Sequence, residues 1–228
     1  MVQPLVLPRR VSAAHVATVC VLVLLTPLDM AEAVDLSPTP VVAADPSVVI
    51  AHLEDLGFPV GQGLAVTGAE TRRGLCIARD LAGLGASRST LRVDEAASLL
   101  ALTSPLPAPK AAIEGMNVSI TCQAGYYVSE GQVERIFKVT TGTGDGTPRG
   151  VFKVQRRTDG WRRSTLYPVM LYKPVNINGA IAVHGVPTPS MIRTSPASHG
   201  CIRVPNRQMD WLFPRLQHGE KVRVYGRW

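Results

Sequence analysis

A cysteine and two histidines near the C-terminus have the residue types needed for nucleophilic chemistry. His184 ends an apolar stretch, and Cys201 follows it by 17 residues, directly after His199 and Gly200. A thiol is a strong nucleophile only when it is deprotonated, and an adjacent imidazole can take its proton. Gly200 leaves the backbone open, so that the N–H groups of Gly200 and Cys201 could face an oxyanion. The pattern predicts a cysteine nucleophile that forms an acyl-enzyme.

The same residue types could instead bind zinc or serve a structural purpose. Structural zinc sites usually take four protein ligands, and catalytic sites take three plus water. No Cys-x-x-Cys or His-Glu-x-x-His sequence accompanies the histidines and the cysteine. The pattern therefore favours a nucleophile and leaves the two other interpretations open. We expect no metal and no other cofactor.

The number of cysteines bears on the assignment of the nucleophile. Three of them, Cys76, Cys122 and Cys201, remain once residues 1–33 are removed. An odd number is notable in an oxidising compartment, where one thiol can stay free for chemistry. With Cys201 reserved as the nucleophile, we expect a disulfide between Cys76 and Cys122. Sequence does not fix connectivity, so this pairing depends on the surroundings of Cys201. Two buried free cysteines are the alternative.

The N-terminus predicts the compartment. Residues 1–33 have the pattern of a secretory signal peptide: Arg9 and Arg10 precede an apolar run, and Ala31-Glu32-Ala33 resembles a cleavage site. An uncleaved membrane anchor is the alternative, although the run is shorter than the roughly 20 residues that span a bilayer. We expect a secreted protein on the periplasmic or cell-wall side of the membrane, with residues 34–45 as a linker.

Composition excludes some classes of protein. The 228 residues are 46% hydrophobic and 18% charged, which permits a buried core and excludes a wholly disordered or collagen-like chain. Lys and Arg number 24 against 17 Asp and Glu, for a net charge of +7. A basic chain can indicate nucleic-acid binding. The chain contains no zinc-finger spacing and no arginine-rich arm, so we expect no nucleic-acid partner.

Residues 46–103 have apolar residues at helical spacing, which predicts a small module of three short helices. The second helix is predicted to begin at a capping box of Thr67 and Glu70 and to continue through Leu84 to Gly85. Such a small module is marginally stable alone.

A Pro-rich linker, residues 104–114, separates this module from residues 115–228, where period-two alternation predicts strands. The apolar residues of the predicted strands are Val118 and Ile120, Ile136 and Val139, Phe152 and Val154, Ile181 and Val183, and Val222 and Val224. One helix is expected around Met209 and Leu212, with Pro214 able to end it. The glycine-rich segment 141–146 precedes a strand rather than a helix, so it predicts a turn beside a site and not a phosphate loop.

The segment Ser198-His199-Gly200-Cys201-Ile202-Arg203, preceded by His184-Gly185, resembles the signature of the L,D-transpeptidase catalytic domain. The resemblance extends over residues 115–227, although Arg149 stands where the family often has a second glycine. More weakly, residues 46–102 resemble a degenerate peptidoglycan-binding three-helix module.

The resemblance implies a mainly β, sandwich-like catalytic domain with mixed sheets and one helix, preceded by a small all-α module. It also implies a transferase of peptidoglycan synthesis, and hence of cell wall biogenesis and cell shape. Cys201 would attack the carbonyl of the third residue of a stem peptide and expel D-alanine, and an amine of a neighbouring stem would resolve the acyl-enzyme. The alternatives are an L,D-carboxypeptidase, in which water resolves it, and a non-catalytic wall-binding protein. We expect a monomer.

The resemblance also implies residue roles. His184 matches the general base, with the Gly185 carbonyl orienting its ring, and His199 and Gly200 match structural and oxyanion positions. Arg203 would hold a substrate carboxylate, with an internal salt bridge as its alternative. The expected substrate-binding residues are Arg203, Ser198, Gly185 and Tyr172; of these, Ser198 is expected to hydrogen-bond within its loop.

Seven basic side chains crowd residues 149–173 against a single acid, Asp159. They form either a solvated strand face or a surface that attracts anionic cell-wall polymers. Tyr172 lies among them and is a candidate groove wall, with core packing as the alternative.

Overall fold

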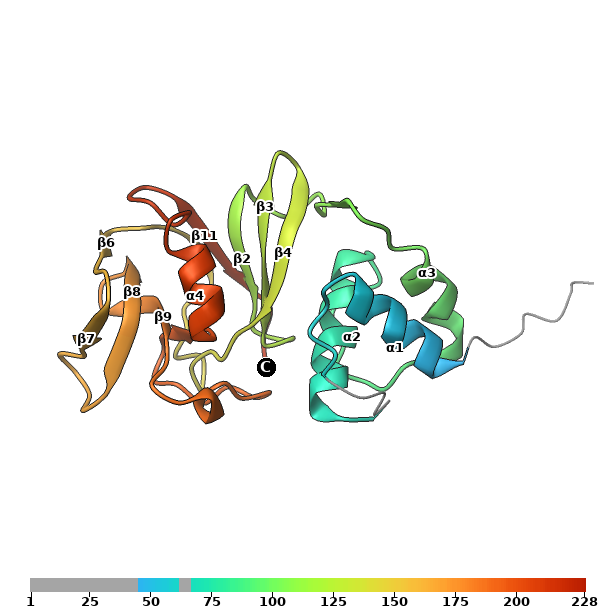
Figure 1. Cartoon of the computed structure of the whole chain (residues 1–228), viewed down its shortest axis with the longest axis horizontal. Coiled ribbons are helices and arrows are strands. Elements are labelled where there is room, and N and C mark those ends of the chain that lie inside the picture. Colours follow the sequence, from blue (N-terminus) through green and yellow to red (C-terminus); the bar gives the residue numbers. More distant parts are fainter. Residues whose placement is uncertain (1–44, 62–66) are drawn as a thin grey trace, which may run out of the picture. The chain divides into compact units, whose positions relative to one another are not determined.

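The computed structural model describes residues 45–61 and 67–228 (Figure 1). The predicted signal peptide, 1–33, and nearly all of the predicted linker, 34–45, lie outside the described residues. Within the described part, no helix has the length and apolar character needed to cross a membrane.

In the described part of the chain, three α-helices precede the sheets, with a short 3-10 turn at Val93–Glu95 before the third. They are α1 (Pro46–Asp55), α2 (Ala69–Leu81) and α3 (Ala96–Leu100). Asp45 caps α1, because its carboxylate accepts the N–H of Ser47 at 2.9 Å. The helices bury their apolar faces in one core, which also contains Tyr126 and Val128 from a strand.

Two predictions about the ends of α2 are wrong. Its N-cap is Gly68, which has no side chain to bond, so there is no capping box of Thr67 and Glu70. The Glu70 carboxylate lies instead 3.1 Å from the ammonium of Lys138. The helix ends at Leu81 rather than near Gly85, because Gly83 adopts a positive φ of 75° and stops the helical path.

A disulfide joins Cys76 of α2 to Cys122, with the two Cα atoms 5.3 Å apart. The predicted disulfide is therefore confirmed, and Cys201 is the free cysteine among the described residues. The two bonded cysteines are separated by 46 positions. Closing a loop of that length restricts the unfolded chain and stabilises the fold by roughly 4 kcal/mol.

The larger sheet has six strands in the order β1-β4-β3-β2-β11-β5. They are β1 (Leu106–Pro107), β2 (Gly115–Ser119), β3 (Ala124–Ser129), β4 (Gln132–Lys138), β5 (Gly150–Lys153) and β11 (Lys221–Tyr225). β11 runs parallel to β2, and the other neighbours are antiparallel. β1 lies in the segment predicted to be only a linker, where Leu106 pairs with Val133.

The second sheet has five strands, in the order β10-β9-β8-β6 with β7 also paired to β8. They are β6 (Arg156–Arg157), β7 (Trp161–Arg163), β8 (Met170–Asn178), β9 (Ile181–Gly185) and β10 (Ile202–Arg203). β10 and β9 are parallel, so both sheets are mixed. The prediction of a mainly β fold with mixed sheets is confirmed.

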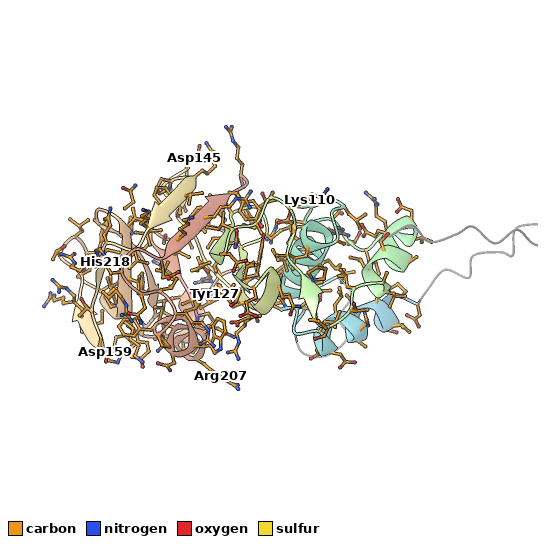
Figure 2. All side chains as sticks on the ribbon, turned by 90° about the horizontal axis from the view of Figure 1, so that it is seen from above. Lys110, Tyr127, Asp145, Asp159, Arg207 and His218 are labelled. Carbon is orange, nitrogen blue, oxygen red and sulfur yellow. A yellow bond between two sulfur atoms is a disulfide. The ribbon has the colours of Figure 1, made fainter. Side chains whose placement is uncertain are left out.

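Helix α4 (Asn206–Leu212) follows β10 and ends two residues before Pro214. Its buried Met209 and Leu212 share a core with Val118 of the larger sheet and Val183 of the smaller one. This shared core packs α4 against the two sheets, next to the strands β9 and β10. Figure 2 shows the side chains over these elements, with Arg207 marking the first turn of α4 and Asp159 the turn before β7.

Candidate active site

The parallel strands β9 and β10 bring the candidate base and nucleophile together. Arg203 pairs with His184 and Ile202 with Val183, and Cys201 directly precedes β10. The Cys201 sulfur lies 3.8 Å from the carbonyl oxygen of Ala180, at the start of β9. Cys201 and His184 both line a cavity of about 280 Å³. Residues 17 positions apart in sequence therefore share one site.

His184 is only 3% exposed, and its ring orientation is set by one backbone contact. Nδ1 lies 2.6 Å from the carbonyl oxygen of Gly185. A carbonyl can only accept, so Nδ1 carries the proton and the lone pair is on Nε2. Burial lowers the His184 pKa to about 4, with the Gly185 carbonyl opposing this shift and Arg203 adding to it. The imidazole is therefore neutral at neutral pH.

The peptide between Gly185 and Val186 is held at both ends. Its carbonyl contacts His184, and its N–H donates to Oδ1 of Asn206 at 2.7 Å. A Cβ at position 185 would lie 2.3 Å from Asn206 Oδ1 and 2.9 Å from Tyr172 Cδ1. Glycine is therefore required here by close approach. Sequence reasoning missed Asn206, since it had predicted only the apolar face of this helix.

Cys201 is a protonated thiol at neutral pH. Burial raises the pKa of the thiol, while an N–H of Ala182 directed at the sulfur and the charge of Arg203 act in the opposite direction. The resting pair is thus a neutral thiol beside a neutral imidazole, rather than a thiolate and an imidazolium.

The loop before Cys201 is closed by Ser198. Its hydroxyl donates to the carbonyl of Cys201 at 2.6 Å and accepts the N–H of Gly200 at 3.0 Å. Ser198 thus hydrogen-bonds within the loop, as the sequence suggested. The Gly200 N–H, expected to face an oxyanion, is already engaged by this hydroxyl. Gly200 has φ +135°, which favours glycine.

A second loop, residues 140–147, is hydrogen-bonded to the motif. The Thr147 hydroxyl donates to the Gly200 carbonyl and accepts the N–H of Gly142, both at 2.7 Å. A Cβ on Gly142 would lie 2.8 Å from the Cα of Gly200. The glycine-rich segment therefore forms a turn packed directly on the motif.

Gln123 connects this turn to the disulfide. Its side-chain amide accepts the N–H of Thr141 at 2.9 Å and donates to the Thr141 hydroxyl at 2.7 Å. The Thr141 carbonyl in turn accepts the N–H groups of Ala197 and Ser198. Gln123 is adjacent to Cys122, and nothing in its local sequence indicated this role.

His199 and Tyr172 differ in their relation to the cavity: His199 lines it, and Tyr172 does not. The His199 ring stacks on Tyr167, with centroids 4.2 Å apart and planes at 16°. Tyr167, from the loop between β7 and β8, lines the cavity, whereas Tyr172 is not among its lining residues. Tyr172 packs against Trp161 and donates its hydroxyl to Asp210 at 2.8 Å. The groove wall predicted at Tyr172 is thus provided by Tyr167.

Arg203 lines the cavity with its guanidinium half-buried. Burial lowers its pKa, and the nearby Cys201 opposes that shift. No acidic side chain of the described residues forms a salt bridge with it, which disfavours the internal ion pair. In residues 45–61 and 67–228 no group of three His, Cys, Asp or Glu side chains is placed to hold a metal ion.

The basic segment 149–173 is only partly neutralised. Lys173 pairs with Asp210 at 2.7 Å and Arg149 with Asp145 at 3.6 Å. Arg162 and Arg163 of β7 are exposed. This leaves a positively charged strand surface next to the loop that carries Tyr167.

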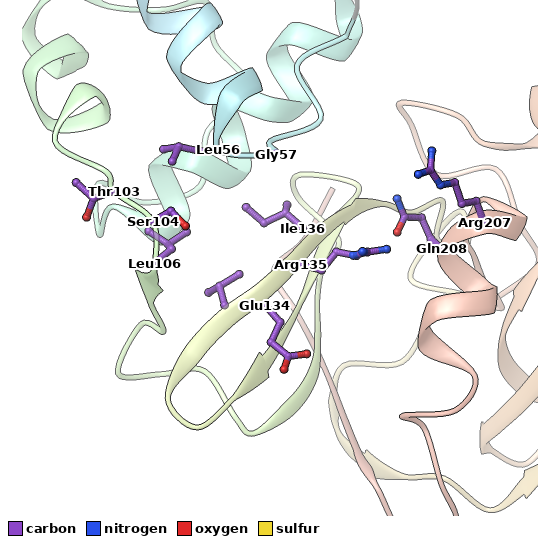
Figure 3. Close-up of a pocket in the computed structure, with 11 residues that line it drawn as sticks. Leu56, Gly57, Thr103, Ser104, Leu106, Glu134, Arg135, Ile136, Arg207 and Gln208 are labelled. Carbon is purple, nitrogen blue, oxygen red and sulfur yellow. The ribbon is translucent and has the colours of Figure 1, made fainter.

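A second cavity, of about 420 Å³, contains no motif residue (Figure 3). Its lining includes Leu56 and Ser104 before the sheets, Arg135 of β4, and Arg207 and Gln208 of α4. In Figure 3 Arg135 extends from its strand toward α4. The lining of this cavity lacks a nucleophile with a neighbouring base, so the Cys201 cavity is the candidate active site.

Comparisons with known proteins show the family and the fold of the chain. Residues 116–224 match the YkuD family, described as the L,D-transpeptidase catalytic domain. The structure resembles that of an L,D-transpeptidase fragment from Xylanimonas cellulosilytica, at 30% identity and a TM-score of 0.55, covering 78% of this chain and 93% of that one. An L,D-transpeptidase from Stackebrandtia nassauensis has the same fold at 20% identity and a TM-score of 0.50, covering 80% and 91%. No curated protein matches the chain.

Proposed function

This chain belongs to the L,D-transpeptidase family, and from that premise we propose that it is a cysteine acyltransferase that cross-links peptidoglycan stem peptides. The observation that carries the proposal is the cavity that Cys201 and His184 share, with His184 within β9 and Cys201 directly before the adjacent parallel strand β10. The thiol and the imidazole Nε2 supply a nucleophile and a base to one small volume.

In the first step, His184 Nε2 takes the thiol proton as the sulfur attacks the carbonyl carbon of the third stem residue. The tetrahedral intermediate collapses with cleavage of the C–N bond, and the leaving D-alanine amine takes the proton from His184. A thioester on Cys201 remains. The neutral resting pair suits this order, because the base is unprotonated and the thiol still carries the proton to be transferred.

In the second step, a side-chain amine of a neighbouring stem attacks the thioester and transfers a proton to His184. The C–S bond breaks, the new amide forms, and the sulfur regains the proton. Atoms and charges balance without a cofactor. Water in place of the amine would give a carboxypeptidase by the same route.

We assign two further roles in this reaction. The N–H of Cys201 faces the oxyanion, while the N–H of Gly200, which donates to Ser198, fixes the loop. The guanidinium of Arg203 binds a carboxylate of the stem peptide, since it lines the cavity and has no acidic partner among the described residues.

We also propose the setting in which the enzyme works. Residues 1–33 direct secretion, which is consistent with the disulfide, and the protein acts as a monomer on the cell-wall side of the membrane. Residues 46–103 form a degenerate peptidoglycan-binding-like module, and the basic surface of 149–173 attracts anionic wall polymers.

Mass spectrometry of the oxidised protein incubated with a tetrapeptide-stem muropeptide tests the reaction. We expect a cross-linked dimer together with released D-alanine. A trimmed tripeptide without dimer would instead show a hydrolase, and unchanged substrate with unmodified Cys201 would contradict catalysis. Cys201→Ala is the control for contaminating activity.

A further inference from the structure

Helix α2 carries two buried arginines whose partners differ. Arg79 is 2% exposed and fully paired: Nε donates to Glu95 at 2.8 Å, and the other nitrogens reach Glu95 and the carbonyls of Ser87, Ser89 and Thr90. All these acceptors lie within residues 87–95. Arg79 therefore joins α2 only to residues of the same helical part of the chain, and stabilises that part.

Arg73 is 0% exposed and poorly paired. Its Nη1 lies 3.6 Å from the Glu70 carboxylate, and neither Nε nor Nη1 has a hydrogen-bond acceptor among the described residues. Burial lowers the pKa of its guanidinium to about 10, with Glu70 opposing that shift. Burying a charge with so few partners is unfavourable for folding.

The hydrogen bond that Arg73 does make leaves the helical part of the chain. Its Nη2 donates to the backbone carbonyl of Arg193, 120 positions away. Arg193 lies in the segment 186–200, which connects His184 to Cys201. The buried guanidinium of Arg73 therefore contacts the segment of chain that links the candidate base to the candidate nucleophile.

The same carbonyl is part of the support of the motif. The Thr140 hydroxyl donates to the Arg193 carbonyl at 3.0 Å and accepts the Arg193 N–H at 2.6 Å. The Thr140 backbone pairs with Arg203 in both directions at 2.9 Å. A shift of the Arg193 peptide would thus reach the strand that follows Cys201.

We propose that Arg73 is a positioning residue for the reaction: it holds the Arg193 carbonyl and thereby fixes the segment 186–200 between His184 and Cys201. Helix α2 is then part of the catalytic scaffold as well as of the wall-binding-like module. The expected change in reaction rate rests on the proposed function. The expected change in the mobility of segment 186–200 does not depend on it.

The test compares Arg73→Met, Arg73→Lys and Arg79→Met in the full oxidised chain. Hydrogen exchange measured by mass spectrometry reports on residues 187–198, and thermal unfolding reports on stability. Acylation of Cys201 by a carbapenem-type β-lactam, which the family resemblance implies, reports on the site. Arg73→Met should exchange faster in 187–198 and acylate about 10-fold more slowly, because small misplacements of reacting groups are costly. Its melting temperature should be unchanged or higher, since an underpaired buried charge is removed.

The two other variants separate positioning from general stability. Arg73→Lys keeps a cationic donor and should recover most of the rate. Arg79→Met leaves the buried Glu95 with only the exposed Arg92, 3.9 Å away, as a cationic neighbour, so it should lower the melting temperature. At a temperature where it stays folded, its exchange in 187–198 and its acylation rate should match those of the wild type.

The proposal would be overturned if Arg73→Met showed the hydrogen exchange and acylation rate of the wild type, or if this variant did not fold. Equal decreases of the acylation rate in Arg73→Met and Arg79→Met would also overturn it. A wild-type protein that no carbapenem acylates would instead contradict the proposed function. The exchange measurement would still decide the role of Arg73 in that case.

Discussion

Two segments that border the Cys201 cavity are built differently. The motif segment, residues 198–203, is tied to its surroundings by the hydroxyls of Ser198 and Thr147 and by backbone pairing with Thr140. The hairpin segment, residues 161–170, is largely exposed: Leu166 is 63% exposed, and Trp161, Tyr167 and Met170 lie between 40% and 47%.

This difference separates two tasks. Reacting groups need fixed geometry, which buried and fully bonded loops provide. Contacts with a variable substrate need surfaces that can adapt, and exposed segments with few buried contacts open at lower free-energy cost. The comparison predicts that changes in the motif segment alter the rate of chemistry, and that changes in the hairpin segment alter substrate binding.

The largest effect is expected for Cys201→Ala, which removes the nucleophile. Both muropeptide cross-linking and covalent acylation by a carbapenem should be lost. Intact-protein mass spectrometry measures the acyl adduct directly. Ser198→Ala is the matched control, since it weakens the loop but leaves the sulfur, and it should still form the adduct. An adduct at the wild-type rate in Cys201→Ala would place the chemistry elsewhere.

His184→Ala should slow acylation by roughly 10²–10⁴-fold, the usual contribution of a positioned base. Stopped-flow fluorescence of carbapenem binding gives the rate, and circular dichroism checks the fold. His199→Ala, which removes only the ring stacked on Tyr167, should have a smaller effect. If His199→Ala is the slower of the two, the base has been misassigned.

The burial of His184 also predicts a pH dependence of folding. Its folded-state pKa of about 4 lies below the ordinary value of about 6.5, so the unfolded chain binds the proton first as the pH falls. The stability from this residue is complete above pH 6.5 and is lost between pH 6.5 and 4. At pH 5 the loss is about 2 kcal/mol. Urea unfolding at pH 7.5 and pH 5 should show a larger decrease for the wild type than for His184→Ala; equal decreases would refute the shift.

Thr147→Val should slow acylation about 10-fold, because it removes both bonds that hold Gly200 and Gly142 and leaves a buried carbonyl unpaired. Thr143→Val is the control: its hydroxyl reaches the Ser198 carbonyl only weakly, at 3.5 Å, and its residue is exposed. Acylation kinetics on both variants measure the difference. Equal acylation rates in the two variants would mean that the hydrogen bonds of Thr147 to the motif do not influence the reaction.

The smallest effect is expected for Tyr167→Ala, in the hairpin segment. Loss of the stack on His199 should change KM by a factor of about three and leave kcat nearly unchanged, since an exposed aromatic contact contributes on the order of 0.5–1 kcal/mol. Tyr167→Phe keeps the ring and should resemble the wild type. A large fall in kcat would contradict the division between the two segments.

Sequence predicts features that are local in the chain. The contiguous Ser198–Arg203 motif, the alternation in β9 and β11, and the odd cysteine are each visible within a few positions. These give the family, the mixed β fold and the disulfide. Pro214 likewise indicated where α4 must end.

Features that depend on distant partners are not predictable in this way. Gln123, Asn206 and Arg73 act through side-chain hydrogen bonds to residues 18, 20 and 120 positions away, and no sequence pattern around them indicates these partners. The same reason explains two wrong predictions. Glu70 lies near Lys138 instead of capping α2, and the aromatic at the cavity is Tyr167 because Tyr172 faces Asp210.

The order of the cysteines along the chain has a consequence for biosynthesis. Protein chains emerge from the ribosome, and from an export channel, N-terminus first, so Cys76 and Cys122 become available to an oxidant before Cys201 does. The structural bridge can therefore close while the nucleophile is still unsynthesised or untranslocated. Refolding of the reduced chain without residues 1–33 offers no such order, since its three thiols compete from the start. Recombinant preparations oxidised after synthesis should then contain isomers in which Cys201 is trapped in a non-native disulfide.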